Sequence, residues 1–188
     1  INGDKKIDEN DKGVLGDPNA ALVFGMNLSM EYKGLDFSMF LQGTSGNEIF
    51  NYTRYFTDFN GFNGNRSKRM LYESWSPSNP NAKLPMLSID EKYSFNPSSY
   101  YIEDGSYLRC KVLQIGYKLP ASMLRKIKID NLRIYVQAQN LFTITNYGGL
   151  DPEMGNRTGG NAPDPYSGID YGNYPSSKVM TVGLNLSF

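Results

Sequence analysis

Residues 2–11 alternate acidic and amide side chains in a pattern that suits a hard cation with oxygen ligands. The donors would be the side chains of Asn2, Asp4, Asp8 and Asp11 and the backbone carbonyl of Lys6. Lys5 stands where a calcium loop needs glycine, and Asp11 replaces its bidentate glutamate. A solvated acidic turn capped by its own side chains explains the same residues. Calcium is therefore a candidate cofactor, with that turn as the alternative, and no other cofactor is predicted.

A second set of candidate residues is aromatic and lies in segments rich in glycine and asparagine. Exposed rings in such segments suit stacking on a sugar or contact with a partner protein, because they bury area at low conformational cost. The candidates are Phe50, Tyr52, Tyr55, Phe56, Phe59, Trp75, Tyr171 and Tyr174. Packing of these rings against their own loops is the alternative, and for the last two so is anchoring at a membrane interface.

Catalytic chemistry has few residues available to it. The 188-residue chain has no histidine and one cysteine, which removes the commonest general base and any thiolate metal cluster. Four acidic residues in the loops are candidates for a glycosidase pair: Asp104, Asp151, Glu153 and Asp170. Nothing in the sequence places two of them at the fixed separation that such a pair needs, and hydrogen bonding within local turns accounts for their presence. Basic and acidic residues balance at 19 each, so no field favours nucleic acid. The sequence predicts a protein that is neither an enzyme nor a nucleic-acid binder.

Five segments alternate apolar and polar residues, which predicts β-strands at 21–32, 35–43, 106–119, 131–143 and 178–188. Lys33-Gly34 predicts a tight hairpin turn between the first two. A change of phase near Val112 predicts a bulge in the third. The fourth strand places one polar row opposite its apolar row: Arg133, Tyr135, Gln137 and Gln139. Burying that row in a dry core would need partners for a guanidinium and two amides, so we predict that it faces a hydrated lumen.

The connections between these strands alternate in length. Those at 33–34 and 120–130 are short, whereas those at 44–104 and 144–177 are long. Successive antiparallel strands place alternate connections at opposite ends, so short turns would gather at one rim and long loops at the other. That asymmetry is typical of outer-membrane β-barrels. A secreted all-β carbohydrate-binding or adhesin domain, using the aromatic loops as its ligand surface, is the alternative.

Several blocks together resemble the late barrel of SusC/RagA-type TonB-dependent outer-membrane transporters. They are residues 101–109 (YIEDGSYLR), 115–120 (IGYKLP), 139–143 (QNLFT), 149–153 (GLDPE), 168–175 (GIDYGNYP) and the terminal Phe188. At the front, residues 15–18 (LGDP) and 40–43 (FLQG) also match. The blocks occur in order along nearly the whole chain.

The resemblance implies an all-β, antiparallel transmembrane β-barrel segment with long extracellular loops. Residues 1–188 would supply about five C-terminal strands of a plugged barrel of ~22 strands. The family imports glycans or peptides across the outer membrane of Bacteroidetes, with a SusD-like surface lipoprotein as lid. We therefore expect that lipoprotein, outer-membrane lipid, and the TonB complex as partners. The last would act through an N-terminal part, with the signal peptide and plug, that precedes Ile1.

Overall fold

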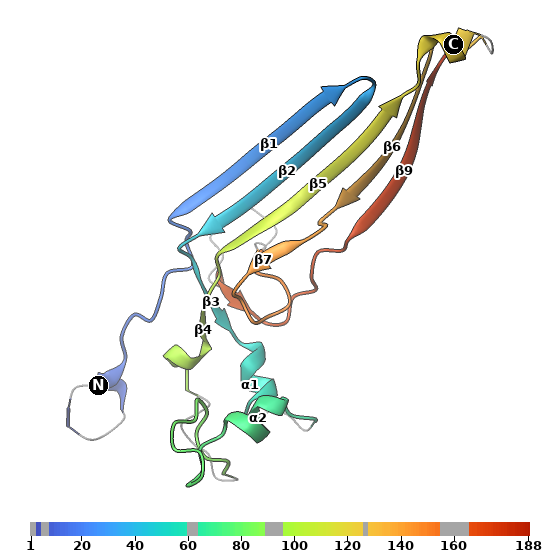
Figure 1. Cartoon of the computed structure of the whole chain (residues 1–188). Helices are drawn as coiled ribbons and strands as arrows, with labels where there is room; N and C mark the ends of the chain where they lie inside the picture. Colours follow the sequence, from blue (N-terminus) through green and yellow to red (C-terminus); the bar gives the residue numbers. More distant parts are fainter. Residues whose placement is uncertain (1–2, 5–7, 60–63, 89–95, 126–127, 155–165) are drawn as a thin grey trace. The chain divides into compact units, whose positions relative to one another are not determined.

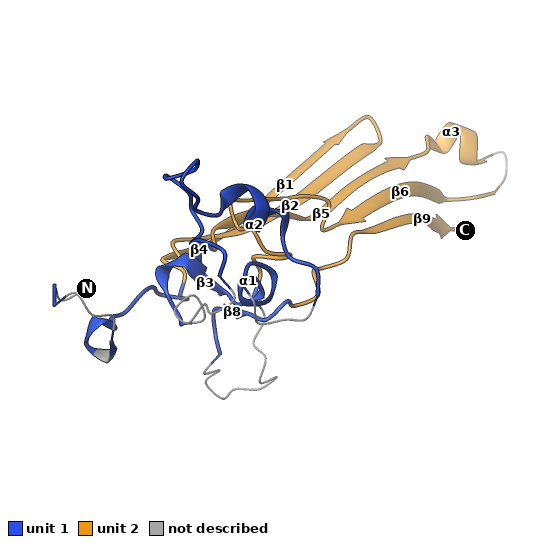
Figure 2. Cartoon of the chain, turned by 90° about the horizontal axis from the view of Figure 1, so that it is seen from below, with its two compact units in different colours: residues 1–19, 48–104, 154–172 blue, residues 20–47, 105–153, 173–188 orange. Residues whose placement is uncertain are grey.

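The computed structural model describes residues 3–4, 8–59, 64–88, 96–125, 128–154 and 166–188 (Figure 1). The chain divides into two compact units (Figure 2). Unit 1 comprises residues 1–19, 48–104 and 154–172, and unit 2 comprises residues 20–47, 105–153 and 173–188. Both long connections predicted from the sequence, 44–104 and 144–177, therefore contribute most of their residues to unit 1.

Unit 2 is a six-stranded antiparallel sheet in the order β1-β2-β5-β6-β9, with β7 paired to β5. Its strands are β1 (Leu22–Tyr32), β2 (Leu35–Ser45), β5 (Tyr107–Lys118), β6 (Asn131–Gln139), β7 (Thr143–Thr145) and β9 (Val179–Ser187). A short helix, α3 (Ala121–Leu124), lies between β5 and β6. The predicted all-β, antiparallel class is confirmed, and the sheet is open, with β1 and β9 at its edges.

The β1–β2 hairpin follows from its turn residues. Lys33 and Gly34 have φ angles of 48° and 87°, and two consecutive positive φ values define the turn type whose twist matches that of paired strands. The strands then pair without interruption from Tyr32 with Leu35 to Leu22 with Ser45. This confirms the predicted hairpin.

Strand β5 contains the bulge that its change of phase predicts. Phe40 of β2 pairs with Val112 and the next residue, Leu41, pairs with Cys110, so Lys111 is the extra residue. Beyond the bulge β5 changes partner, from β6 to β7. The predicted strand 131–143 is interrupted at the same level, because Asn140 adopts a φ of 50°, outside the extended range.

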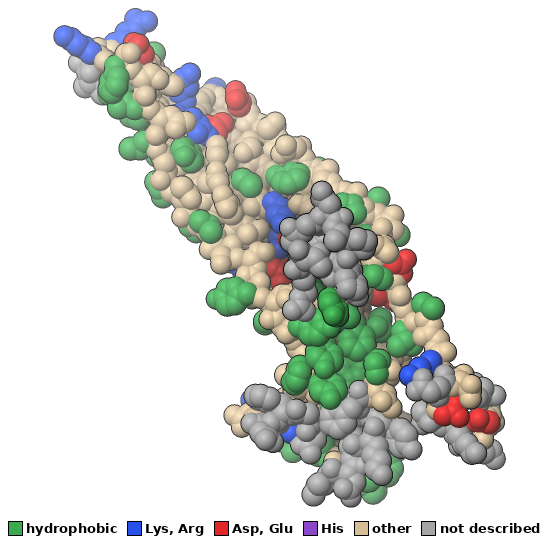
Figure 3. All heavy atoms as spheres, turned by 180° about the vertical axis from the view of Figure 1, so that it is seen from behind, with side chains coloured by type: hydrophobic (Ala, Val, Ile, Leu, Met, Phe, Trp, Pro, Cys, Tyr) green, Lys and Arg blue, Asp and Glu red, His purple; other side chains and the backbone are tan. Residues whose placement is uncertain are grey.

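The register places apolar side chains from all five long strands on one face of the sheet. Central members of this apolar face are Leu28 and Met39 on the hairpin, Ile115, Val136 and Val182. The opposite face carries mostly polar and small residues, including the predicted row on β6. On the side of the sheet shown in Figure 3, hydrophobic side chains are scattered among polar and charged ones.

Unit 1 holds a three-stranded sheet, in the order β4-β3-β8, and short helices. The strands are β3 (Glu48–Asn51), β4 (Ile102–Asp104) and β8 (Ile169–Asp170), and β8 runs parallel to β3. The helices are η1 (Glu9–Asp11), α1 (Thr53–Thr57), α2 (Lys68–Glu73) and η2 (Ser99–Tyr101). Phe59, Leu84 and Tyr101 form its buried core. No helix in the described ranges is long and apolar enough to cross a membrane.

Candidate functional site

A buried charged cluster sits on the sheet of unit 2, where β5 changes partner. Arg109, with 4% of its side chain exposed, donates from Nη2 to Asp151 Oδ1 at 2.5 Å and from Nη1 to Glu153 Oε2 at 2.6 Å. Lys111, the bulge residue, donates from Nζ to both carboxylate oxygens of Glu153 at 2.7 Å. Two cations and two carboxylates therefore satisfy one another. We call these residues the Arg109 cluster.

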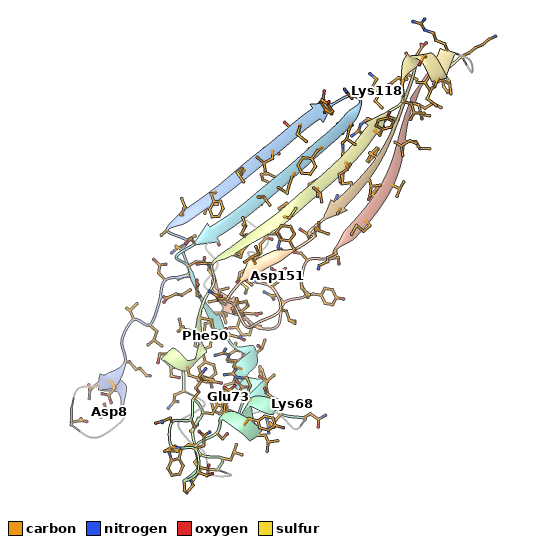
Figure 4. The ribbon with its side chains drawn as sticks, in the orientation of Figure 1. Asp8, Phe50, Lys68, Glu73, Lys118 and Asp151 are labelled. Carbon is orange, nitrogen blue, oxygen red and sulfur yellow. The ribbon has the colours of Figure 1, made fainter. Side chains whose placement is uncertain are left out.

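The Arg109 cluster ties three stretches of chain together. Arg109 Nε donates to Thr143 Oγ1 of β7 at 2.8 Å, and Asp151 Oδ2 accepts from the backbone N–H of Ser176, just before β9, at 2.9 Å. Asp151 is labelled in Figure 4. Burial by itself would raise the pKa of the Asp151 carboxyl. The hydrogen bonds from Arg109 and from two backbone N–H groups outweigh burial and hold that pKa below its usual value.

Sequence reasoning missed Arg109 as a functional residue and assigned Asp151 and Glu153 only to local turns. The turn is present, since Asp151 Oδ1 accepts from the N–H of Glu153 at 2.9 Å. What the turn does not explain is the pairing with Arg109, 42 positions earlier in the sequence. Two of the resemblance blocks, 101–109 and 149–153, meet in this cluster. The only sequence signal was a charged residue on a strand of alternating pattern.

The residues of the predicted polar row of β6 do lie together on the polar face of the sheet. The first two, Arg133 and Tyr135, contact each other and residues of neighbouring strands. Arg133 donates to Asp36 of β2 at 2.8 Å and 2.5 Å, although β5 runs between these strands. The pair crosses β5 over Gly116, which has no side chain. The Tyr135 ring lies over Gly183 of β9, and the Arg133 guanidinium lies 5.0 Å from the centre of that ring. That Arg133, Tyr135, Gln137 and Gln139 face a lumen stays a prediction.

Gly116→Ala is expected to break this bridge, at a cost of about 1–2 kcal/mol in the free energy of unfolding. A Cβ at this position would lie 2.4 Å from Arg133 Nη2 and 2.5 Å from Asp36 Oδ2, so the ends of both side chains must move and we expect the ion pair to separate. Thermal unfolding of the full-length protein measures the loss. Gly13→Ala, where a Cβ would meet no atom within 4 Å, is the control. In a background carrying Asp36→Asn and Arg133→Gln, Gly116→Ala should cost almost nothing. An equal cost there would contradict the bridge.

Five of the predicted aromatic residues form one connected group in unit 1, which we call the aromatic cluster. Tyr52 is its centre, with ring centroids 5.1 Å from Tyr55 and from Tyr171 and 5.2 Å from Phe56. Phe50 adjoins Tyr52 at 6.3 Å. Phe56 and Tyr171 remain exposed at 38% and 39%. β3 and β8 position the cluster, because Tyr52 N–H donates to the Asp170 carbonyl and Phe50 N–H to the Gly168 carbonyl.

Three predicted ligand contacts lie outside the aromatic cluster. Phe59 is buried in the core with Leu84 and Tyr101, so its prediction as a surface contact is wrong, because the local sequence of a loop does not show which ring a distant segment covers. Trp75 is exposed, and no ring contact joins it to the aromatic cluster among the described residues. Tyr174 is exposed and belongs to unit 2.

A second buried acid, Asp58, lies at the end of α1 in the same unit. Asp58, with 2% of its side chain exposed, accepts from Tyr100 Oη at 2.5 Å and from Arg69 Nη1 at 3.2 Å. Burial, and then the hydrogen bond to Asp58, raise the pKa of the Tyr100 phenol well above its usual value, so it stays a donor. Arg69 reaches Asp58 from α2, which Ser67 caps by accepting from the N–H of Arg69. Asp58 thus joins α1, α2 and η2.

The candidate calcium segment falls partly outside the described residues, which exclude Asn2 and Lys6. Asp8 Oδ1 accepts from the N–H of Asn10 at 2.8 Å, and Asp11 Oδ2 accepts from the N–H of Asp8 at 3.0 Å. These bonds are the capped acidic turn of the alternative interpretation. No group of three or more acidic or cysteine side chains suited to a metal occurs in the described ranges. Calcium binding by Asp4, Asp8 and Asp11 stays a prediction.

No family model matches the sequence. Among curated proteins, the whole chain is 38% identical to a TonB-dependent receptor of Formosa agariphila and 31% identical to the TonB-dependent receptor SusC of Bacteroides thetaiotaomicron. The chain spans 18% and 17% of the lengths of these two relatives, about a sixth. Among solved structures, the RagAB peptide importer in its closed-closed state matches 93% of this chain and 18% of its own. The TM-score is 0.75 at 29% sequence identity.

A second structure of that importer, in its open-open state, matches with a TM-score of 0.71 at 31% identity. It covers 90% of this chain and 17% of its own. The sequence comparison and the structure comparison therefore point to the same kind of receptor over almost the whole chain. They agree with the resemblance of the ordered blocks, two of which, 101–109 and 149–153, meet in the Arg109 cluster. In sequence and fold, this chain corresponds to one segment of the SusC/RagA-type TonB-dependent receptors.

Proposed function

We propose that this chain forms wall strands and surface loops of an outer-membrane, TonB-dependent importer of peptides or glycans. Its position would be the C-terminal part of a multi-pass β-barrel. In this role the protein binds cargo and lets it pass, without forming or breaking covalent bonds, so no enzymatic activity is proposed. A SusD-like surface lipoprotein and the TonB complex are the proposed partners, the latter acting through a part of the receptor beyond this segment.

The observation that carries the proposal is the exposed apolar face of the unit 2 sheet. Several large hydrophobic residues on β1, β5, β6 and β9 are 40–73% exposed along this face, for example Leu28, Ile115, Val136 and Val182. Soluble monomers rarely expose so large an apolar surface. In a barrel, lipid acyl chains would cover the apolar face, and the polar face would border water in the lumen. The backbone edges of β1 and β9 would pair with neighbouring strands of a closed barrel, since unpaired edges are costly in lipid.

The aromatic cluster is the proposed contact for cargo or for the lid protein. The structural neighbours are peptide importers by their descriptions, and the curated relatives include SusC. Tyr52 and its neighbours present ring edges and partly exposed faces from an ordered backbone, which limits the entropy lost on binding. The alternative of a secreted adhesin domain is not proposed, because the relatives that match the whole chain are receptors.

Tyr52→Ala is expected to weaken binding of cargo or lid protein to the full-length receptor by about tenfold. Removing the central ring leaves Tyr55, Phe56 and Tyr171 without their shared partner. Titrations with labelled peptide, with oligosaccharide and with the purified lid protein measure the loss and identify which of the three uses the cluster.

The control for this experiment is Tyr72→Ala, since Tyr72 is 72% exposed in the same unit. It has no ring contact with the aromatic cluster among the described residues. Equal affinities of the two variants for all three ligands would contradict the role of the aromatic cluster. Failure of the unaltered receptor to insert into the outer membrane would contradict the proposed function itself.

A further inference from the structure

The apolar face of the unit 2 sheet ends in an aromatic row at the short-turn end, and basic residues follow it. Register places Tyr32, Leu35 and Tyr117 side by side in this last row. Beyond it lie three exposed cations that we call the basic collar: Lys33 in the β1–β2 turn, and Arg125 and Lys128 in the connection between β5 and β6. Basic side chains project at this end of the sheet in Figure 3 (blue, upper left).

The backbone under the basic collar is held in place by hydrogen bonds. Lys33 lies in the tight turn, whose Gly34 carbonyl accepts from the N–H of Lys118 at 2.7 Å. Lys128 adopts a φ of 57° and donates its N–H to the Arg125 carbonyl at 3.4 Å. Asp130 N–H then donates to the carbonyl of Ser187 on β9 at 2.9 Å. The collar therefore extends along the end of the sheet from the β1–β2 turn to the connection between β5 and β6, which Asp130 ties to β9.

The charge of the basic collar is not neutralised within the described part of the chain, where none of its three cations forms an ion pair. Lys33 Nζ lies 5.2 Å from the centre of the Tyr32 ring. In the sequence, the two short connections contain one further basic residue, Lys126, and a single acidic residue, Asp130. By contrast, Arg109 and Lys111 near the opposite end of the sheet are paired with Asp151 and Glu153. Lys178, before β9, is one exposed cation at that opposite end without an ion pair among the described residues, so unpaired positive charge gathers at the short-turn end without being confined to it.

We propose that the basic collar binds the phosphate groups of anionic phospholipids, at the membrane surface on the short-turn side. This rests on the proposed function, because it requires acyl chains against the apolar face. Tyrosine rings favour the depth of lipid headgroups, and flexible basic side chains extend from there to phosphate oxygens. Lys118 is not included, because its register opposite Arg133 places it on the polar face. The ligand is the lipid headgroup rather than free phosphate.

The test compares two triple variants of the full-length receptor. Lys33→Gln, Arg125→Gln and Lys128→Gln together remove the basic collar, whereas Lys68→Gln, Lys83→Gln and Lys178→Gln remove three exposed lysines elsewhere. Native mass spectrometry measures binding of phosphatidylglycerol and of phosphatidylethanolamine to each. A basic residue near an anionic surface contributes about fivefold to affinity, so the collar variant should bind phosphatidylglycerol roughly a hundredfold more weakly. The control variant should keep the preference of the unaltered receptor for phosphatidylglycerol.

Three results would contradict lipid binding by the basic collar. They are an unchanged lipid preference in the collar variant, an equal loss of phosphatidylglycerol binding in the control variant, and displacement of the lipid by millimolar inorganic phosphate alone. Heat-modifiable migration on a detergent gel is recorded for every sample and reports whether the barrel is formed. A receptor that shows it and lacks the lipid preference contradicts only the basic collar. A receptor that never shows it contradicts the proposed outer-membrane function.

Discussion

Arg109→Met is expected to lower the free energy of unfolding of the receptor by about 3–5 kcal/mol. The substitution leaves Asp151, which is 7% exposed, without its cation in a buried position. Two backbone N–H groups, of Glu153 and Ser176, would still donate to that carboxylate, but they do not cancel its charge. The loss should appear as a lower temperature for the change in heat-modifiable migration.

A second substitution separates buried charge from lost packing. Asp151→Asn added to Arg109→Met should recover part of the loss, because a neutral amide needs no cation and its one oxygen can still accept from one of the two N–H groups. Glu153→Gln alone should cost less than Arg109→Met, since Glu153 is 30% exposed. No recovery in the double variant would show that packing, and not charge compensation, is what Arg109 supplies.

Val136→Arg is expected to cost about 2–4 kcal/mol in the free energy of folding into a bilayer. Val136 is 50% exposed on the apolar face of β6, where it pairs with Ile115 and Val182. A guanidinium there would have to lie in hydrocarbon. Urea titration of the receptor folded into phosphatidylcholine vesicles measures the change.

The control for this variant is the next residue in the same strand. Gln137→Arg points to the opposite, polar face, where it pairs with Gln114 and Thr181, and should change the same free energy by less than about 0.5 kcal/mol. Similar costs at both positions would mean that water, rather than lipid, borders the apolar face. That result would remove the observation on which the proposed function depends.

The strands of unit 2 could be predicted because their signal is local. Alternation in β1, β2, β6 and β9 states which residues share a face, and the change of phase near Val112 states where β5 bulges. Lys33-Gly34 specifies its turn through backbone conformation alone. The end of β6 at Gln139 could not be predicted so well, because Asn140 breaks the strand only where β5 bulges opposite it.

Contacts between segments far apart in the chain were not available to that reasoning. Neither Arg109 nor Asp151 carries a signal of the other, and Phe59 resembles the exposed rings around it until Leu84 and Tyr101 cover it. Likewise, the Arg133–Asp36 bridge depends on the absence of a side chain at Gly116, on the strand between them. Periodicity encodes which face a residue occupies, and it was sufficient to assign the apolar and polar faces of the sheet. Partners across 42 or 97 positions are set by strand order and loop path, so only the tertiary structure decided them.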